Sequence, residues 1–423
     1  MNRTTSRLPA WLVGSGVIAV AMGVMNVSTY AFTILAARWL GPSEYGALAA
    51  VMGLLLVVNV VSLGLQATGA RRVSAAPQDL PHIEAQVLSA SYRSALVLGV
   101  LCLAAAPVVT WLLRLDSWAT AALLAATSVP LTVMGGQAGI LQGERRWLPL
   151  AGIYLMSGLG RVVFGVAALL VRPDALGAMV GVALGAFAPT VLGWFALRHP
   201  ARQRDRTPSE PAAGQGRPTA RLLKEVAHNA HALLAFFALS NADVVIARGV
   251  LPDHESGLYA GGLILAKAVL FLPQFVVVIA FPSMAAAGAG RWTHLKGLAM
   301  VLGIGTLATA GAAALSRLAV LFVGGSAYTE LQPIIWAFAA VGTLLAMIQL
   351  MVYSVVARQH QRSVFVVWAG LLALLAAAPF VESIGFLLGV VVTVESVVLL
   401  VLVALSLRHP EPAPAEPLAP PAA

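Results

Sequence analysis

Long apolar runs alternate with short polar breaks along almost the whole of the 423-residue chain. The breaks hold most of the charged residues and the Gly-Pro turns, and the runs between them are about 20 residues long. This is the length that an α-helix needs to cross the hydrocarbon core of a bilayer. Cutting the chain at the breaks predicts twelve membrane-spanning helices, at 11–37, 45–68, 94–113, 118–141, 148–171, 175–197, 226–249, 256–281, 297–323, 330–356, 363–381 and 384–407.

Lysine and arginine are distributed unequally between the two ends of these predicted helices. Nineteen of the 26 lie at the end that shares a side with the N-terminus, four lie at the other end, and three fall within helices. Because positively charged loops stay in the cytoplasm, this bias predicts that both termini are cytoplasmic. One missed helix would scramble the alternation, so the bias also supports the count of twelve.

The composition fits a membrane protein and no soluble class. Hydrophobic residues form 59% of the chain, charged residues 10%, and the mean hydropathy is +0.88. A soluble domain carries about 25% charged residues in its polar shell, whereas a multispanning protein has lipid as its solvent. The net charge of +9 does not indicate a nucleic-acid partner, since the basic residues lie in breaks where topology explains them. The single cysteine, Cys102, excludes an intrachain disulfide.

The longest break divides the predicted helices into six and six. Residues 198–225 are rich in Pro, Gly, Arg and Ser and predict a flexible, basic cytoplasmic linker. We therefore expect an N-terminal six-helix lobe over 1–197 and a C-terminal six-helix lobe over 226–408. The Pro/Ala-rich tail, 409–423, is expected to be disordered.

A short pattern recurs at the same place in both halves. "ILAARWLGPSEYGALAA" and "VVIARGVLPDHESGLYAGG" each contain Ala-Arg, a proline four residues after the arginine, and then a glutamate and a glycine. Each copy lies between the first and second helix of its half, on the same side of the membrane. Two lobes of one orientation are related by an axis along the membrane normal, a plan of transporters with a substrate site between the lobes.

The first copy, Ala37–Gly46, resembles the polysaccharide flippases of the multidrug/oligosaccharidyl-lipid/polysaccharide (MOP) exporter superfamily. The stretches "VSLGLQATGARRVSA" (61–75), "GILQGERRW" (139–147) and 241–285 are similar to the same family. The resemblance covers most of residues 11–360, and it implies an all-α polytopic protein whose two six-helix bundles face each other in a V. It also implies a polyprenyl-diphosphate-linked oligosaccharide as cargo, a bacterial cell membrane as location, and membrane lipids and other polysaccharide-assembly membrane proteins as partners.

Three basic residues fall within the predicted spans: Arg161, Lys267 and Arg317. A charge at mid-span costs ~2.5–3.5 kcal/mol on insertion scales, so each one requires a partner or a water-filled cavity. Arg317 is too near a span end to support a role. The candidate substrate-binding residues are therefore Arg161 and Lys267, with Arg38 and Arg248 at the outer mouth. Arginine suits a diphosphate through its planar fork, and lysine through its point charge.

Structural roles compete with these binding roles. Asp243, two residues after Asn241, is expected at the same depth as Lys267 on an adjacent antiparallel helix, so a salt bridge between them is possible. Arg161 could instead bond to carbonyl groups across helices, and Arg38 and Arg248 could extend to lipid headgroups.

The sequence favours a secondary, ATP-independent flippase that is not an enzyme. It has no Gly-rich loop followed by Lys-Ser/Thr, and its histidines lack metal-ligand spacing, so we expect neither a cofactor nor a metal. A cation-coupled multidrug exporter of the same superfamily is an alternative, although it would require acidic groups within the first six spans, which hold none at mid-membrane. A membrane glycosyltransferase or polymerase would require an acidic residue in a sizeable outer loop, and the outer loops have only a few residues.

Overall fold

The computed structural model describes residues 10–198, 218–284, 291–357 and 363–408, which are helical throughout apart from short turns. The helices of the first half are α1 Ala10–Val58, α2 Val60–Ala75, α3 Leu80–Leu112, α4 Trp118–Gly143, α5 Trp147–Val171 and α6 Ala175–Leu197. Those of the second half are α8 Pro218–Val250, α9 Asp253–Met284, α10 Arg291–Ala314, α11 Ser316–Val323, α12 Ile335–Ala357, α13 Val364–Ala377 and α14 Ile384–Arg408. Short 3-10 turns are η1 Pro77–Asp79, η2 Gly325–Leu331 and η4 Ala378–Phe380.

Two parts of the predicted domain plan fall partly or wholly outside these ranges. The tail, 409–423, lies outside the described residues, as does the linker up to residue 217. The last eight residues of the predicted linker are described, and they form the first turns of α8.

The first predicted span and most of the second lie in α1, which consists of two helical segments that meet at Gly41. The predicted Gly-Pro turn between them is a single non-helical residue, Gly41, with φ of 71° and ψ of 175°. Only glycine adopts such a conformation without strain, and the following Pro42 further restricts the backbone before it. The polar break in the sequence is therefore a one-residue turn between the two helical segments of α1.

Nine helices in the described ranges are long and apolar enough to cross a membrane. The difference from twelve has a physical explanation in three places. The stretch Gly16–Ala75 counts once although the bend at Gly41 divides it, and the apolar helix Val364–Phe380 is shorter than the threshold. The third is α9, of which only part is fully described.

The third helix begins earlier than predicted. We expected a span from residue 94, but α3 starts at Leu80 and is 33 residues long. Its first turns bury Ile83, Val87 and Ala90, which follow the three-to-four-residue spacing of an amphipathic helix. The connection between α2 and α3 is consequently only a short turn.

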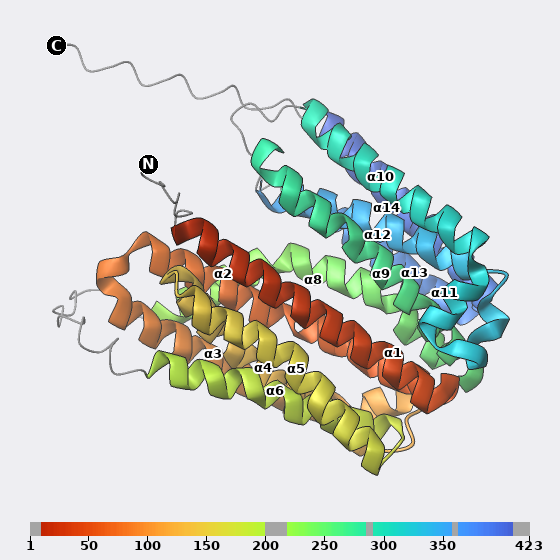
Figure 1. Ribbon diagram of the computed structural model, residues 1–423, viewed down its shortest axis with the longest axis horizontal. Coiled ribbons are helices and arrows are strands. Elements are labelled where there is room, and N and C mark those ends of the chain that lie inside the picture. Colours follow the sequence, from red (N-terminus) through yellow and green to blue (C-terminus); the bar gives the residue numbers. More distant parts are fainter. Residues whose placement is uncertain (1–9, 199–217, 285–290, 358–362, 409–423) are drawn as a thin grey trace, which may run out of the picture.

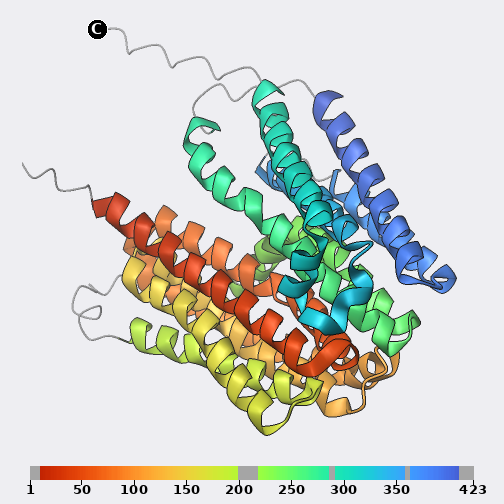
Figure 2. The same cartoon turned by 45° about the vertical axis from the view of Figure 1, so that its right-hand side comes forward.

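The helices form two bundles (Figure 1). Helices α1 to α6 pack on one another, as do α8 to α14, and the bundles meet where α1 contacts α8 and α9 and where α2 contacts α8. In both ribbon views the start of α1 and the end of α9 diverge, whereas the bend of α1 lies against the start of α9 (Figure 2). This is the expected two-lobed, V-shaped arrangement, and its closed end carries the two Arg-Pro motifs.

The glycines of the repeated motif allow the two backbones to touch at this closed end. A Cβ atom on Gly257 would lie 1.8 Å from the carbonyl oxygen of Pro42, and one on Gly46 would lie 2.9 Å from the Cα atom of Gly257. Gly46 and Gly257 occupy equivalent positions in the two copies of the motif. The internal repeat therefore packs against itself across the boundary between the bundles.

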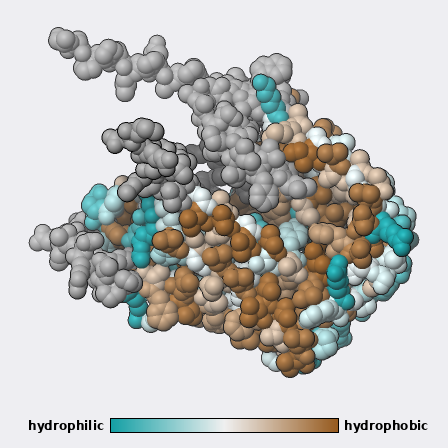
Figure 3. All heavy atoms as spheres, in the orientation of Figure 1, coloured by the Kyte–Doolittle hydropathy of each residue, from teal (hydrophilic) through white to brown (hydrophobic). Residues whose placement is uncertain are grey.

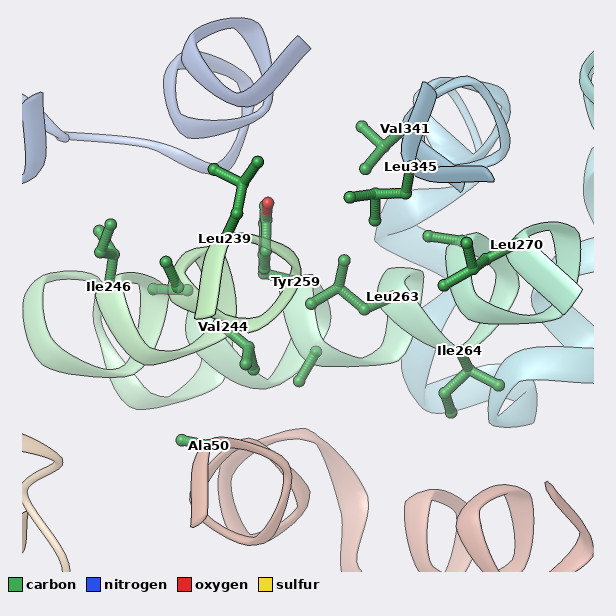
Figure 4. Close-up of a cluster of buried hydrophobic side chains, with 14 of the residues drawn as sticks. Ala50, Leu239, Val244, Ile246, Tyr259, Leu263, Ile264, Leu270, Val341 and Leu345 are labelled. Carbon is green, nitrogen blue, oxygen red and sulfur yellow. The ribbon is translucent and has the colours of Figure 1, made fainter. Parts of the chain in front are cut away.

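Apolar packing continues from this contact into the second bundle. Figure 4 shows Leu239 and Val244 of α8, Tyr259 and Leu263 of α9 and the α12 side chains around one buried cluster, with Ala50 of α1 on its far side. On the face shown in Figure 3, hydrophobic side chains cover the middle, and hydrophilic ones lie mainly toward its two ends. This distribution matches a protein whose central band lies in lipid.

Candidate functional site

The candidate site lies where α1 and α2 face α8 and α9. Gly53 of α1 lies against α8, because a Cβ atom there would be 2.9 Å from Val244 Cγ1 and 3.6 Å from Asn241 Oδ1. Tyr30 of α1 and Phe271 of α9 meet edge to face, with ring centroids 6.1 Å apart. Polar residues on these faces of α8 and α9 therefore lie at the boundary between the two bundles.

Lys267 of α9 is held by an amide and not by a carboxylate. Its Nζ donates to Asn241 Oδ1 at 2.8 Å, and Asn241 Nδ2 donates to the Phe237 carbonyl oxygen at 2.8 Å. The predicted salt bridge from Lys267 to Asp243 is not formed among the described residues. Asp243 bonds to Tyr259, another residue of α9, and interacts with Lys267 only through space. The charge of Lys267 is thus not neutralised by direct contact, and its side chain is partly exposed.

Asp243 instead faces the interior of the second bundle. Its carboxylate accepts a hydrogen bond from the Tyr259 hydroxyl at 3.1 Å and one from the Val244 backbone N–H at 2.8 Å. Glu395 of α14 interacts electrostatically with it. Glu395 is 1% exposed, and its Oε2 has no hydrogen-bond partner in the described structure. The sequence placed Glu395 within a span but gave no reason to join it to Asp243.

Arg161 of α5 lies on the side of its helix that faces the other helices of the first bundle. On the same helix, Gly158 packs on Met25 of α1 and Gly165 packs on Phe32. Leu159 and Val163, on the opposite side, are exposed. The Arg161 side chain is partly exposed, and no described residue accepts a hydrogen bond from it or forms an ion pair with it. A cation without a partner at this depth is the arrangement that an anionic ligand or water-filled space would complete.

A chain of polar side chains, missed in the sequence, shares this interior. Gln66 Nε2 of α2 donates to the Tyr154 hydroxyl of α5 at 2.7 Å and to Gln142 Oε1 of α4 at 2.9 Å. Tyr154 is two helical turns from Arg161 on the same side of α5. Glutamines within apolar runs were the available signal, and only tertiary structure shows that they meet.

Arg248 lies at the closed end of the molecule and joins the two bundles there. It is 4% exposed, and its guanidinium donates to the carbonyl oxygens of Leu113 at 2.9 Å, Arg114 at 3.1 Å and Ser43 at 3.3 Å. Asp253 forms two ion pairs, one with Arg248 at 3.1 Å and one with Arg114 at 3.3 Å. Arg114 in turn donates to the carbonyl oxygens of Arg248 and Leu251. These bonds join both bundles, and they occupy the donors that a diphosphate would need.

The matching arginine of the first half also bridges the bundles. Arg38 is exposed, and its Nη2 donates to the Leu321 carbonyl oxygen of α11 at 2.7 Å. Nearby, the Tyr328 hydroxyl of η2 donates to the Ala37 carbonyl oxygen at 3.3 Å. Burial raises the pKa of the Tyr328 hydroxyl, so this donor keeps its proton. The structure brings Arg38 and Arg248 to the closed end and places Arg161 and Lys267 along the helices.

Nothing in the described ranges gathers three or more of His, Cys, Asp and Glu into a group that could hold a metal ion. The polar groups of the candidate site in these ranges are the cations Arg161 and Lys267, amide and hydroxyl side chains, and the buried carboxylates of Asp243 and Glu395.

The sequence profile of the family described as polysaccharide biosynthesis protein matches residues 12–287, more than half of the chain. The chain belongs to this family. Among curated proteins no match is found.

Solved structures show which fold this polysaccharide biosynthesis family member shares. An inward-facing multidrug resistance MATE transporter of the MOP superfamily is 15% identical, with a TM-score of 0.63 over 90% of this chain and 93% of that one. A eukaryotic MATE transporter is 15% identical, with a TM-score of 0.59 over 93% of both chains. A MOP superfamily transporter from Pyrococcus furiosus, described as having a binding pocket of reverse polarity, is 14% identical, with a TM-score of 0.57 over 93% of this chain and 94% of that one.

At these identities the structural likeness concerns the fold alone. Family and fold together identify a multi-pass membrane protein of the polysaccharide biosynthesis family with the helical fold of the solved MATE transporters.

Proposed function

We propose that this protein moves a polyprenyl-diphosphate-linked oligosaccharide from the cytoplasmic to the outer leaflet by alternating access, without ATP, for the synthesis of a surface polysaccharide. The observation that carries the proposal is the Arg161 guanidinium, which lies inside the first bundle with no described partner. A planar guanidinium donates two parallel hydrogen bonds to a phosphate. The family's link to polysaccharide synthesis supplies the class of cargo.

Lys267 is the second proposed contact with the diphosphate. Its ammonium has three donors, and Asn241 accepts from it. Rotation of the remaining donors toward the space between the bundles would let it act as a point charge on a phosphate oxygen. We assign Arg248 and Arg38 a different role, since both hold the bundles together at the closed end.

The predicted orientation completes the proposal. With both termini in the cytoplasm, the closed end that carries Arg248 faces outward, and the diverging ends of α1 and α9 face the cytoplasm, where the cargo would enter. The proposed location is the bacterial cell membrane, and other membrane proteins of polysaccharide assembly are the proposed partners.

Reconstituted vesicles test this function directly. A fluorescent undecaprenyl-diphosphate-linked sugar is incorporated, and a membrane-impermeant reductant then quenches only the outward-facing dye. The protein should increase the quenched fraction. Arg161→Ala should lower the transport rate ~10–100-fold, the range expected for loss of a charge-assisted hydrogen-bond pair, and Arg161→Lys should retain part of the rate.

Arg317→Ala is the matched control, because Arg317 is an exposed arginine of α11 away from the bundle interior. Its rate should equal that of the unaltered protein. Normal transport by Arg161→Ala would remove the phosphate role of Arg161. Equal movement of fluorescent phosphatidylcholine would show that the protein is a nonselective scramblase.

A cation-coupled multidrug exporter is the second candidate, and the buried Asp243 and Glu395 favour it. Two carboxylates in one bundle, one of them without a partner on Oε2, are suited to proton or cation exchange. Uptake of a cationic dye driven by an imposed ion gradient, with no movement of the lipid-linked sugar, would support this candidate over the flippase.

A further inference from the structure

A second site lies on the lipid-facing side of the first bundle. Helices α3, α4 and α6 enclose a groove of about 800 Å³ that is lined almost entirely by apolar side chains. Small residues of α3 and α4, among them Ala95, Gly99 and Ala126, form its floor. Leu96 of α3 and Val191 of α6 form its walls, and both are exposed.

The groove contains one unsatisfied polar group. Gln137 of α4 lines it and is 1% exposed, yet its Oε1 has no hydrogen-bond partner in the described structure. The amide fits beside α6 because residue 193 is glycine, where a Cβ atom would lie 2.3 Å from Gln137 Oε1. A buried carbonyl oxygen without a partner costs about 1–3 kcal/mol, and only a hydrogen-bond donor would remove this cost.

The groove has the length of one leaflet and a charged mouth. Its α3 lining extends from Tyr92 to Leu103, about 16 Å along a helix, which is close to half of the ~30 Å hydrocarbon core. At the end near Tyr92, Trp194 of α6 lines the groove, and the Arg198 guanidinium lies 4.0 Å from the centre of the Trp194 ring. Aromatic rings and an arginine together mark the level of lipid headgroups.

We propose that this groove binds an anionic glycerophospholipid of the cytoplasmic leaflet. One acyl chain lies along α3 and α6 over the small residues, and the phosphate pairs with Arg198 at the end of α6. Gly193, next to Gln137, precedes Arg198 by five residues, or about 7.5 Å of helix, so the apolar part of the groove lies deeper in the membrane than the guanidinium.

The occupant is a phospholipid and not the transported cargo, because of where the groove lies. Its lining comes from Tyr92 to Leu103 of α3 and from α4 and α6, whereas the two bundles face each other through α1, α2, α8 and α9, with the end of α3 near Leu112 also reaching α8. Cargo that moves between the bundles would not pass through it. The lipid site is therefore independent of the proposed flippase function.

Photolabelling tests the site. The full-length protein is placed in nanodiscs of phosphatidylcholine with a small fraction of phosphatidylglycerol that carries a photoreactive group midway along one acyl chain. Labelled peptides should come mainly from α3, α4 and α6, and unlabelled phosphatidylglycerol should compete better than phosphatidylcholine. Arg198→Gln should reduce this preference about fivefold, the contribution of one basic residue near a membrane surface.

Filling the groove gives the sharper comparison. Ala126 is exposed on the groove floor, so Ala126→Trp should remove most of the label without disturbing the core. Val163→Trp, at an exposed position of α5 outside the groove, should keep it. Val191→Trp fills the groove from α6 and serves if Ala126→Trp does not fold.

Three outcomes would overturn the proposal. They are label spread evenly over all exposed helices, equal labelling of the filled and control variants, and displacement of the label by undecaprenyl diphosphate at lower concentration than by phosphatidylglycerol. The last would assign the groove to the polyprenyl chain of the cargo.

Discussion

Replacing Gly257 by alanine should open the closed end of the molecule. The added Cβ atom would lie 1.8 Å from the Pro42 carbonyl oxygen, so the two backbones must separate by about 1.6 Å to reach an ordinary contact of 3.4 Å. The oxygen belongs to a backbone and cannot rotate away as a flexible side chain would. Overpacking of this kind costs about 1–3 kcal/mol, and the cost falls only on the state in which these backbones touch.

A penalty on one state shifts the equilibrium between states. About 1–3 kcal/mol changes the ratio of the state in which these backbones touch to the state in which they are apart by ~5–150-fold. Spin labels on Asp116 and Gln332, exposed residues of the two bundles near the closed end, report this ratio as a distance distribution, in a background where Cys102 is replaced by alanine. Gly257→Ala should enlarge the long-distance population.

The control is Gly303→Ala in α10, where a Cβ atom has nothing within 4 Å. Its distance distribution should match that of the parent. An unchanged distribution in Gly257→Ala, with unchanged thermal stability, would refute the conclusion that glycine contact holds this end closed.

Three other substitutions test the charges of Arg248 and Glu395 and the hydroxyl group of Tyr328. Arg248→Ala should lower the free energy of unfolding by about 1–3 kcal/mol, measured by thermal unfolding in detergent, because it leaves the carbonyl groups of Leu113, Ser43 and Arg114 without their donor; a loss near zero would contradict the bracing role. Glu395→Gln should raise the melting temperature, since it removes a buried carboxylate with an unpartnered oxygen. Burial raises the pKa of Tyr328 above its ordinary value of about 10, so above about pH 10 the unfolded state loses a proton that the folded state keeps. Stability should then fall with rising pH, and less steeply in Tyr328→Phe. Parallel curves for the two proteins would show that Tyr328 does not contribute to this dependence.

The membrane-spanning fold was predictable because lipid imposes a simple requirement on sequence. Each crossing needs about 20 apolar residues with its backbone bonds satisfied internally, and hydropathy detects such runs. The early start of α3 at Leu80 was missed because hydropathy averages over polar residues, although Ile83 and Val87 carry an amphipathic period. The Gly-Pro pair in a polar break predicted a turn between the first two spans, but only the structure shows that one residue at positive φ is enough to make it.

The sequence predicted only those candidate site residues whose charge is costly within a membrane span, because this cost can be recognised without knowing their neighbours. Arg161 and Lys267 stand out because a mid-span charge is expensive. The burial of Arg248 depends on carbonyl groups from α1 and α3, and no local pattern encodes that meeting. The partner of Lys267 also required the structure, because the choice between Asn241 and Asp243 depends on the rotation of α8.

The bend of α1 gives the first helix the properties of a lever. Gly41 lies next to Pro42, whose carbonyl oxygen touches Gly257, so the pivot is adjacent to the contact between the bundles. From the pivot to Ala10 the helix is continuous, with an arm of about 46 Å. A rotation of about 5° at the pivot would displace the far end by about 4 Å, because the arm carries no intervening loop to absorb it. Movements too small to disturb side-chain packing near Gly41 would therefore become large enough at the opposite end to admit or release a bulky headgroup.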